Sequence, residues 1–344
     1  MTKNPTMREI ARIAGVSLSS VSLVLNNKPN VTPEMRERVL DAASTLGYRH
    51  RVAGNTPLVT TLSTVGLLTK RRQDDQLIVN PFYSYIIDGV ERECQRNNIN
   101  LMYANVEVDE RNHALSWPAM LLNDMVDGVI IVGAFLEQAI SDISMRLGRS
   151  IVLVDAYTSV NTAFDSVVID NLGGAIKAVS HLIENNHRHI GLIGSNPDSY
   201  PSVLERRQGY LLALAQAGIH DTYIEDGYLN RQEAFEATIR LLHKSPQITA
   251  IFACNDETAI GVINAIRHTG LRVPEDVSVV GFDDIDLAQE VIPPLTTIHV
   301  DKVLMGTMAL RLLRDRIDDM DKAAIKTVVS TQLITRGSVR YIED

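Results

Sequence analysis

The chain has 344 residues, enough for two or three domains, and its 45% apolar and 22% charged residues are typical of a globular protein. It has no run of about 18 apolar residues and its N-terminus lacks an apolar signal core, so we expect no membrane span, no export and a cytoplasmic protein. The net charge of −9 is uneven: residues 1–57 hold eight Lys or Arg and four Asp or Glu, which gives +4 there and −13 in the remainder. A basic head on an acidic body is expected when only the head meets nucleic-acid phosphates.

The first helix is predicted to begin at Thr6, because Thr6 and Glu9 have the spacing of a capping box. Gly15 permits the tight turn that ends this helix, and Ser17 caps a second one. Apolar residues at helical spacing predict the buried face of the first helix: Ile10, Ile13 and Ala14. The same spacing predicts the buried face of the second helix: Val21, Val24 and Leu25.

A third helix is predicted from Thr32, a cap residue followed by proline at the first helical position, to Gly47. Its expected core residues are Val39, Ala43 and Leu46. Two short helices joined by a tight turn, with a third packed across them, form a helix-turn-helix whose second helix reads the major groove. The sequence therefore predicts an all-α DNA-binding head over residues 1–50.

The head closely resembles, over more than forty residues without a gap, that of the LacI/GalR family of bacterial repressors; the stretch reads REIARIAGVSLSSVSLVLNNKPNVTPEMRERVLDAASTLGYR. The resemblance implies a homodimer on a pseudo-palindromic double-stranded operator, with contacts from Thr6, Ser17, Leu18, Ser19, Ser20, Ser22, Leu23, Asn26 and Lys28. Leu23 stands where the family often has an arginine, a residue that can pair with guanine. Because Leu18 and Leu23 suit thymine methyl groups, we predict half-sites biased toward A·T at the bases they face.

Residues 51–64 have no helical stripe and are predicted to be a linker. In the family this segment usually folds on DNA into a hinge helix whose leucine wedges into the minor groove. Here Pro57 stands where that leucine should, and Gly54 and Asn55 disfavour a helix before it. Either Pro57 or Leu58 serves as a wedge in altered geometry, or the hinge helix is absent and the DNA is less bent. We favour the second.

The body, residues 65–344, alternates short apolar runs with helical segments such as 84–97 and 114–125. One set of strands is predicted at 65–68, 101–105, 128–133 and 151–155, and a second at 166–170, 190–194, 223–226, 250–254 and 277–282. Two β/α sets predict an α/β body of two doubly wound parallel-sheet subdomains with a cleft at the carboxyl ends of the strands.

The last predicted elements, a strand at 296–300, a helix at 302–317 and a strand at 328–334, are too few for another domain. We therefore expect discontinuous subdomains: about 65–160 plus 293–326, and about 161–292 plus 327–344. This body resembles the periplasmic-binding-protein-like fold that the repressor family carries.

The resemblance implies a cleft between the subdomains that holds a small effector. It maps ligand-binding roles onto Arg206, Asn255 and Asp283, with Asp256 capping a helix and Arg207 left as a solvated charge. Phe82 and Tyr83 are expected as exposed rings of a turn beside the cleft, and further candidates are Phe135, Asp155, Tyr157, Tyr200 and Tyr228. An ordinary helix cap is the expected role of Asp170.

These patterns predict a sequence-specific DNA-binding repressor controlled by a sugar, a sugar phosphate or a nucleoside, with neither a metal nor a cofactor. His187 and His189 lack a carboxylate partner and are expected at the surface, and Cys94 and Cys254 are expected to be buried and inert. The alternatives are a nucleotide-dependent enzyme, for which GxGxxG and GxxxxGK[ST] are missing, and a solute-binding protein, against which the basic head argues.

Overall fold

The computed structural model of the chain divides into two compact units, Met1–Val59 and Thr60–Asp344. The structure describes residues 6–25, 31–32, 35–36, 38–39, 42, 62–72, 81–109, 114–133, 139–140, 143–144, 150–157 and 164–343. The predicted contacts of Asn26, Lys28, Pro57, Leu58 and Phe135 therefore lie outside the described residues.

In the first unit, α1 (Met7–Ala14) and α2 (Leu18–Leu25) follow one another across a turn at Gly15, whose φ is 65°. Both predicted helix starts are confirmed. The Glu9 carboxylate accepts a hydrogen bond from the Thr6 amide at 2.6 Å, and the Ser17 hydroxyl accepts one from the Ser20 amide at 3.1 Å. A small apolar core holds these helices together: Ile10, Ala14, Val21, Val24, Val39 and Ala42.

Ile13 does not belong to that core. The prediction that it is buried is wrong, because its side chain is 46% exposed. Ile10 and Ala14, four residues apart, share the inward face of α1 and leave Ile13 on the flank.

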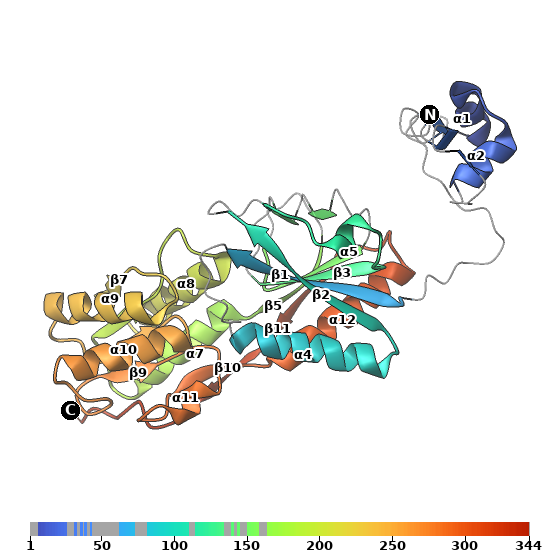
Figure 1. The fold of residues 1–344 in the computed structure, drawn as a ribbon. Coiled ribbons are helices and arrows are strands. Elements are labelled where there is room, and N and C mark those ends of the chain that lie inside the picture. Colours follow the sequence, from blue (N-terminus) through green and yellow to red (C-terminus); the bar gives the residue numbers. More distant parts are fainter. Residues whose placement is uncertain are drawn as a thin grey trace. The chain divides into compact units, whose positions relative to one another are not determined.

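The first subdomain of the body is built on a six-stranded sheet of order β11-β5-β4-β3-β1-β2, in which every ladder is parallel. Its strands are β1 (Thr64–Arg72), β2 (Asn100–Val108), β3 (Gly128–Val132), β4 (Ser150–Val154), β5 (Asp165–Ile169) and β11 (Lys326–Val329). Helix α4 (Pro81–Arg96) packs beside α12 (Lys302–Asp318) on this sheet, and α5 (Ala119–Leu122) is a single turn (Figure 1).

The second subdomain has a parallel four-stranded sheet of order β7-β6-β8-β9. Its strands are β6 (Ile190–Ile193), β7 (Tyr223–Glu225), β8 (Ala250–Ala253) and β9 (Ser278–Val280). Its helices are α7 (Asn171–Glu184), α8 (Pro201–Gln216), α9 (Arg231–Lys244), α10 (Asp256–His268) and α11 (Leu287–Glu290). An antiparallel pair is formed by β10 (Thr297–Val300) and β12 (Thr331–Ile334). It adjoins β9 through a bridge between Val280 and Thr296, and a second bridge joins Asp283, just beyond β9, to His299.

The two parallel sheets confirm the predicted fold class, but three strands lie in the other subdomain from the one expected. β5 and β11 belong to the six-stranded sheet, although both were assigned to the second subdomain. β10 lies beside β9, although it was assigned to the first. Strand order depends on contacts between distant segments, which local patterns do not carry.

Three local predictions are also wrong. The helix expected over 114–125 is reduced to α5, because Ala114 bridges to Val108 and Pro118 stands at the cap of the helix. The single strand expected over 328–334 is divided into β11 and β12. His187 is buried rather than exposed, and its ring nitrogens contact Thr249 and the carbonyl of Arg340.

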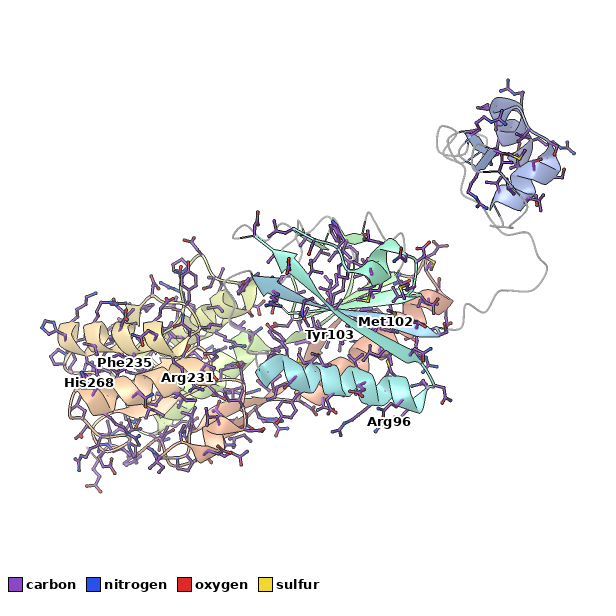
Figure 2. All side chains as sticks on the ribbon, viewed as in Figure 1. Arg96, Met102, Tyr103, Arg231, Phe235 and His268 are labelled. Carbon is purple, nitrogen blue, oxygen red and sulfur yellow. The ribbon has the colours of Figure 1, made fainter. Side chains whose placement is uncertain are left out.

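Close helix pairs stiffen both subdomains. A Cβ atom at Gly306 of α12 would collide with the Ile86 carbonyl of α4, and one at Gly261 of α10 with the Arg231 carbonyl of α9. The rings of Phe235 and His268 meet across the second pair with centroids 5.4 Å apart (Figure 2). These backbone approaches require glycine.

Candidate functional site

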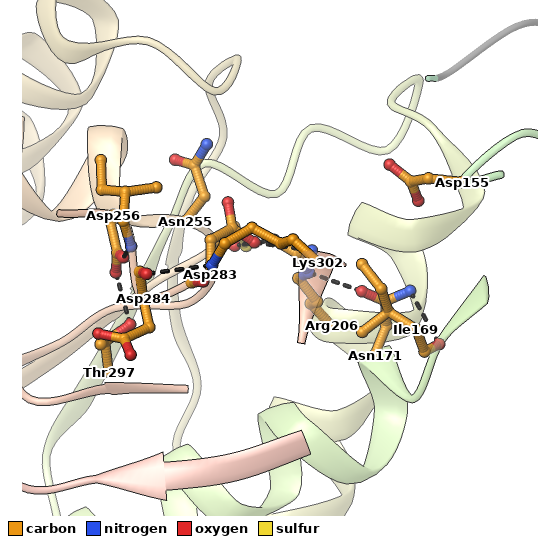
Figure 3. Close-up of polar contacts among 12 residues, drawn as sticks. Asp155, Ile169, Asn171, Arg206, Asn255, Asp256, Asp283, Asp284, Thr297 and Lys302 are labelled. Carbon is orange, nitrogen blue, oxygen red and sulfur yellow. Dashed lines mark hydrogen bonds and ion pairs between the residues drawn. The ribbon is translucent and has the colours of Figure 1, made fainter. Parts of the chain in front are cut away.

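A cluster of buried polar side chains gathers where the strands of the two sheets end. Asp155 directly follows β4 and Asp283 lies just beyond β9, while Arg206 belongs to α8, Asn171 opens α7 and Lys302 opens α12 (Figure 3). The carboxyl ends of parallel strands are where open α/β sheets bind ligands. The structure thus brings together three of the predicted effector-binding residues, Asp155, Arg206 and Asp283.

Arg206 is the centre of the cluster. Its Nε donates to Asn171 Oδ1 at 2.9 Å, its Nη1 donates to the Cys254 carbonyl at 2.6 Å, and its Nη2 lies 3.3 Å from Asp283 Oδ1. The guanidinium also lies over the Phe282 ring, 3.8 Å from the centroid. A buried cation held on all sides in this way fixes the position of the groups around it.

Asp283 is held in an unusual backbone conformation, with φ of 109°, and is only 7% exposed. Its Oδ1 is buried and forms an ion pair with Arg206 Nη2 at 3.3 Å. The same oxygen accepts no hydrogen bond of good geometry from the described residues. Burial raises the pKa of the Asp283 carboxyl, against the opposing effect of Arg206 and Lys302. This oxygen is therefore ready to accept a hydrogen bond from a ligand.

Two tyrosines hold Asp155. Tyr83 of α4 donates to its Oδ2 at 3.0 Å, and Tyr157 donates to its Oδ1 at 3.2 Å. Burial raises the pKa of Asp155 to about 6, although nearby Arg206 opposes the shift. Burial and the Asp155 charge in turn raise the pKa of Tyr83, so its hydroxyl remains a donor.

Lys302 was not anticipated from the sequence. Its Nζ donates to the carbonyls of Asp283 at 2.5 Å and Asp284 at 3.0 Å, and lies 5.7 Å from the centroid of the Phe82 ring. Burial lowers the pKa of Lys302 against the attraction of the surrounding carboxylates. Phe82 is buried in the first turn of α4, so the expectation of an exposed turn residue is wrong for it.

The helix cap predicted at Asp256 falls on Asn255 instead, and the ligand contact predicted for Asn255 stays a prediction. Asn255 caps α10 by accepting from the Thr258 amide at 2.9 Å, whereas Asp256 lies within the helix. The Asp256 carboxylate instead accepts from the Ile285 amide and the Thr297 hydroxyl, which ties α10 to the loop after β9 and to β10.

The remaining candidates lie at the margin of the cluster. The Tyr200 hydroxyl accepts from Lys70 Nζ at 2.8 Å, so this pair joins α8 to β1. Tyr228 is exposed, and among the described residues its backbone amide donates to Glu233 rather than to a member of the cluster. Asp170 caps α7 by accepting from the Gly173 amide at 2.9 Å, as expected.

Arg207 is not a lone solvated charge. It donates to the Ser195 carbonyl and to Asp226, each at 2.7 Å.

Asn171 and Lys302 are the functional candidates that sequence reasoning missed. A polar residue directly after a buried strand is the available signal for Asn171, and it applies equally to Asp170. No local signal marks Lys302, since a lysine at the start of an amphipathic helix is usually solvated.

The head presents a second candidate surface on α2. Leu18 is 44% exposed and Leu23 is 39% exposed, and Ser19 is exposed beside them. The Ser17 hydroxyl lies 2.7 Å from that of Ser19 and 2.8 Å from that of Ser20, so the serines at the start of α2 form one hydroxyl cluster. An apolar surface next to a helix N-terminus can meet both thymine methyl groups and phosphate.

Both units match known families. Residues 6–50 match the profile of bacterial regulatory proteins of the lacI family, and residues 179–339 match that of the periplasmic binding protein-like domain. Among the described residues, no helix has the length and apolar character needed to cross a membrane.

Curated relatives match along nearly the whole chain. The HTH-type transcriptional repressor PurR of Mannheimia succiniciproducens is 30% identical over 342 residues, which cover 98% of this chain and 99% of that protein. The Ribose operon repressor of Haemophilus influenzae is 33% identical over 339 residues, which cover 97% and 98%. A solved structure of the Lac repressor dimer bound to operator and the anti-inducer ONPF is 25% identical with a TM-score of 0.67, covering 98% of this chain and 100% of that one.

Proposed function

The chain belongs to the LacI family of bacterial regulatory proteins, and we propose how its two units share the work of an effector-controlled, DNA-binding repressor. Its curated relatives are repressors rather than enzymes. Two copies of the chain place two heads on a pseudo-palindromic operator, since a two-fold dimer matches two-fold DNA. We propose that this activity takes place in the cytoplasm, where a bacterial operator lies.

The DNA-reading surface comprises residues of α2 and the residues that flank it. We assign base contacts to the exposed side chains of Leu18, Ser19 and Leu23, and backbone contacts to the hydroxyl cluster around Ser17. The predicted roles of Thr6, Ser20, Ser22, Asn26 and Lys28 remain part of this proposal. The predicted absence of a hinge helix at Pro57 implies a weakly bent operator, and a strong central bend in circular-permutation gel shifts would contradict it.

The effector binds at the polar cluster of the body. The observation that carries this assignment is the buried Arg206–Asp283 pair, in which one carboxylate oxygen lacks a good partner. Asp155 and Tyr83 face the same region from the first subdomain, so one ligand can bind groups from both subdomains. A sugar, a sugar phosphate or a nucleoside carries the hydroxyl groups that such a site recognises.

Binding of the effector controls the head through the arrangement of the two subdomains. The ligand shifts that arrangement only if it binds one form more tightly, and a difference of about 1–3 kcal/mol is typical of such coupling.

The test combines ligand screening with operator binding by the full chain. A panel of metabolites is screened by thermal shift, because a ligand at about 100 times its Kd stabilises the folded state by about 2.7 kcal/mol. The best ligand should then change operator affinity in a gel-shift titration. The assignment of the effector site is wrong if Arg206→Ala and Asp283→Ala both keep the full thermal shift.

A further inference from the structure

The Asp283–Asp284 turn, which follows β9, has two successive residues with positive φ. The angle is 109° at Asp283 and 52° at Asp284. Residues other than glycine rarely adopt such conformations, which persist only where the surrounding structure holds them. Here the carbonyls of both residues accept hydrogen bonds from one ammonium, that of Lys302, at 2.5 Å and 3.0 Å (Figure 3). A cation that binds two successive carbonyls fixes the orientation of both peptide groups.

The side chains carried by this turn and by the residues just after it contact both subdomains. Asp283 pairs with Arg206 of the polar cluster, within the second subdomain, at 3.3 Å. Asp286, the cap residue of α11, accepts a hydrogen bond from the hydroxyl of Tyr85, which belongs to α4 of the first subdomain. A short piece of backbone therefore joins the proposed effector site to a direct contact between the two subdomains.

Lys302 reaches the turn from the other subdomain. It is the first residue of α12, a helix that packs on the sheet of the first subdomain, and it is only 6% exposed. Its ammonium also lies 5.7 Å from the ring centroid of Phe82 and 5.9 Å from that of Tyr85, both on α4. Lysine is almost never buried unless its charge is paired. This ammonium therefore binds the turn of one subdomain beside the aromatic rings of the other.

From these contacts we propose that Lys302 is a positioning residue that links the effector site to the contact between the subdomains. Its ammonium holds the turn that presents Asp283 to the effector and, through the residues that follow, Asp286 to α4. A rigid turn passes a displacement of one end on to the other, whereas a loose turn absorbs it. The inference rests on the proposed function, because Asp283 is assigned to the effector site there.

The experiment measures amide hydrogen exchange in the ligand-free full chain and in Lys302→Met, which keeps an unbranched side chain and removes the ammonium. The amides of Asp283 and Ile285 report on the turn, because both donate hydrogen bonds, at 2.8 Å and 2.9 Å. We expect both to exchange at least about tenfold faster in the variant. The amides of β8 should keep their rates, since a merely structural loss of stability would accelerate the whole body alike.

The contact between the subdomains gives a second readout. The ¹³Cζ resonance of Tyr85, identified by its loss in Tyr85→Phe, responds to the carboxylate that its hydroxyl binds. Asp286→Asn removes the charge of that carboxylate, and Lys302→Met should move the resonance in the same direction. Lys244→Met is the matched control, because this exposed lysine pairs with Glu225 on β7, at the opposite edge of the sheet from β9. It should leave both readouts unchanged.

If Lys302→Met does not fold, Lys302→Gln carries the test, because it removes the charge but keeps a hydrogen-bond donor; exchange in the turn should then be at least about threefold faster. The inference is overturned if the turn of the folded variant exchanges as slowly as in the parent chain, if the whole body accelerates equally, or if the Tyr85 resonance does not move. These results leave the proposed function intact. A chain that binds no metabolite in the thermal-shift screen contradicts the proposed function instead.

Discussion

Replacing Arg206 with alanine should destabilise the body strongly. The change removes a buried cation from three partners, and it leaves Asn171 and the Cys254 carbonyl without their donor and Asp283 without its counter-charge. Breaking a buried ion pair by removing one partner costs about 3–5 kcal/mol. For a domain of this size, a loss of 1 kcal/mol lowers Tm by roughly 2 °C, so we expect a decrease of about 6–10 °C.

The neighbouring arginine provides a matched control within the same helix. Arg207 pairs with the exposed Asp226 and donates to the Ser195 carbonyl. A surface ion pair is worth about 0–1 kcal/mol and a neutral hydrogen bond about 1 kcal/mol, so Arg207→Ala should lower Tm by no more than about 4 °C.

Thermal unfolding of the ligand-free full chain distinguishes the two variants. The single tryptophan, Trp117, lies in the body unit, so its fluorescence follows the body and not the head. Equal losses of stability in Arg206→Ala and Arg207→Ala would refute the reasoning, because they would show that burial of the pair has no energetic consequence.

Further predictions concern pH, packing and DNA reading. The pKa of Asp155 is raised from 3.8 to about 6 in the folded chain, so the folded state binds the proton more tightly and stability should fall as pH rises from about 4 to 6. Asp155→Asn should remove this part of the slope, up to about 3 kcal/mol, in denaturation curves measured across that range; an unchanged slope would assign it to other groups. Gly306→Ala should destabilise the body by about 1–3 kcal/mol, because the collision with the Ile86 carbonyl outweighs the gain of about 1 kcal/mol in helix propensity. A variant as stable as the parent chain would show that α4 and α12 can separate freely. Selection from random duplexes should return A·T pairs opposite Leu23, and an obligatory guanine there would contradict the apolar reading face.

Local sequence patterns were sufficient to predict the elements that are stabilised by interactions between residues close together in the chain. The capping box at Thr6 and Glu9 and the turn at Gly15 lie where they were predicted, because their interactions span only a few residues. The resemblance to a known family placed Arg206 and Asp283, and the structure brings these two residues into contact.

Contacts between distant segments could not be predicted in the same way. Asn171 binds Arg206 because α7 and α8 pack side by side, and Lys302 joins the cluster because α12 begins beside the loop after β9. Helical and strand periodicity describe which face of an element is buried, but not which element covers it. The cap of α10 at Asn255 rather than at the predicted Asp256 has a different cause, since either residue type can cap a helix and a shift of one residue decides which one does.

The position of β11 also has a consequence for synthesis on the ribosome. The edge of β5 that β11 covers is complete at Ile169, but β11 begins only at Lys326. At translation rates of about 5–20 residues per second, that edge waits on the order of ten seconds for its partner. An open strand edge is a template for pairing with other nascent chains. The edge of β5 is therefore open to aggregation through most of the second half of translation, and chaperones that cover exposed strand edges would be most useful to the body during that interval.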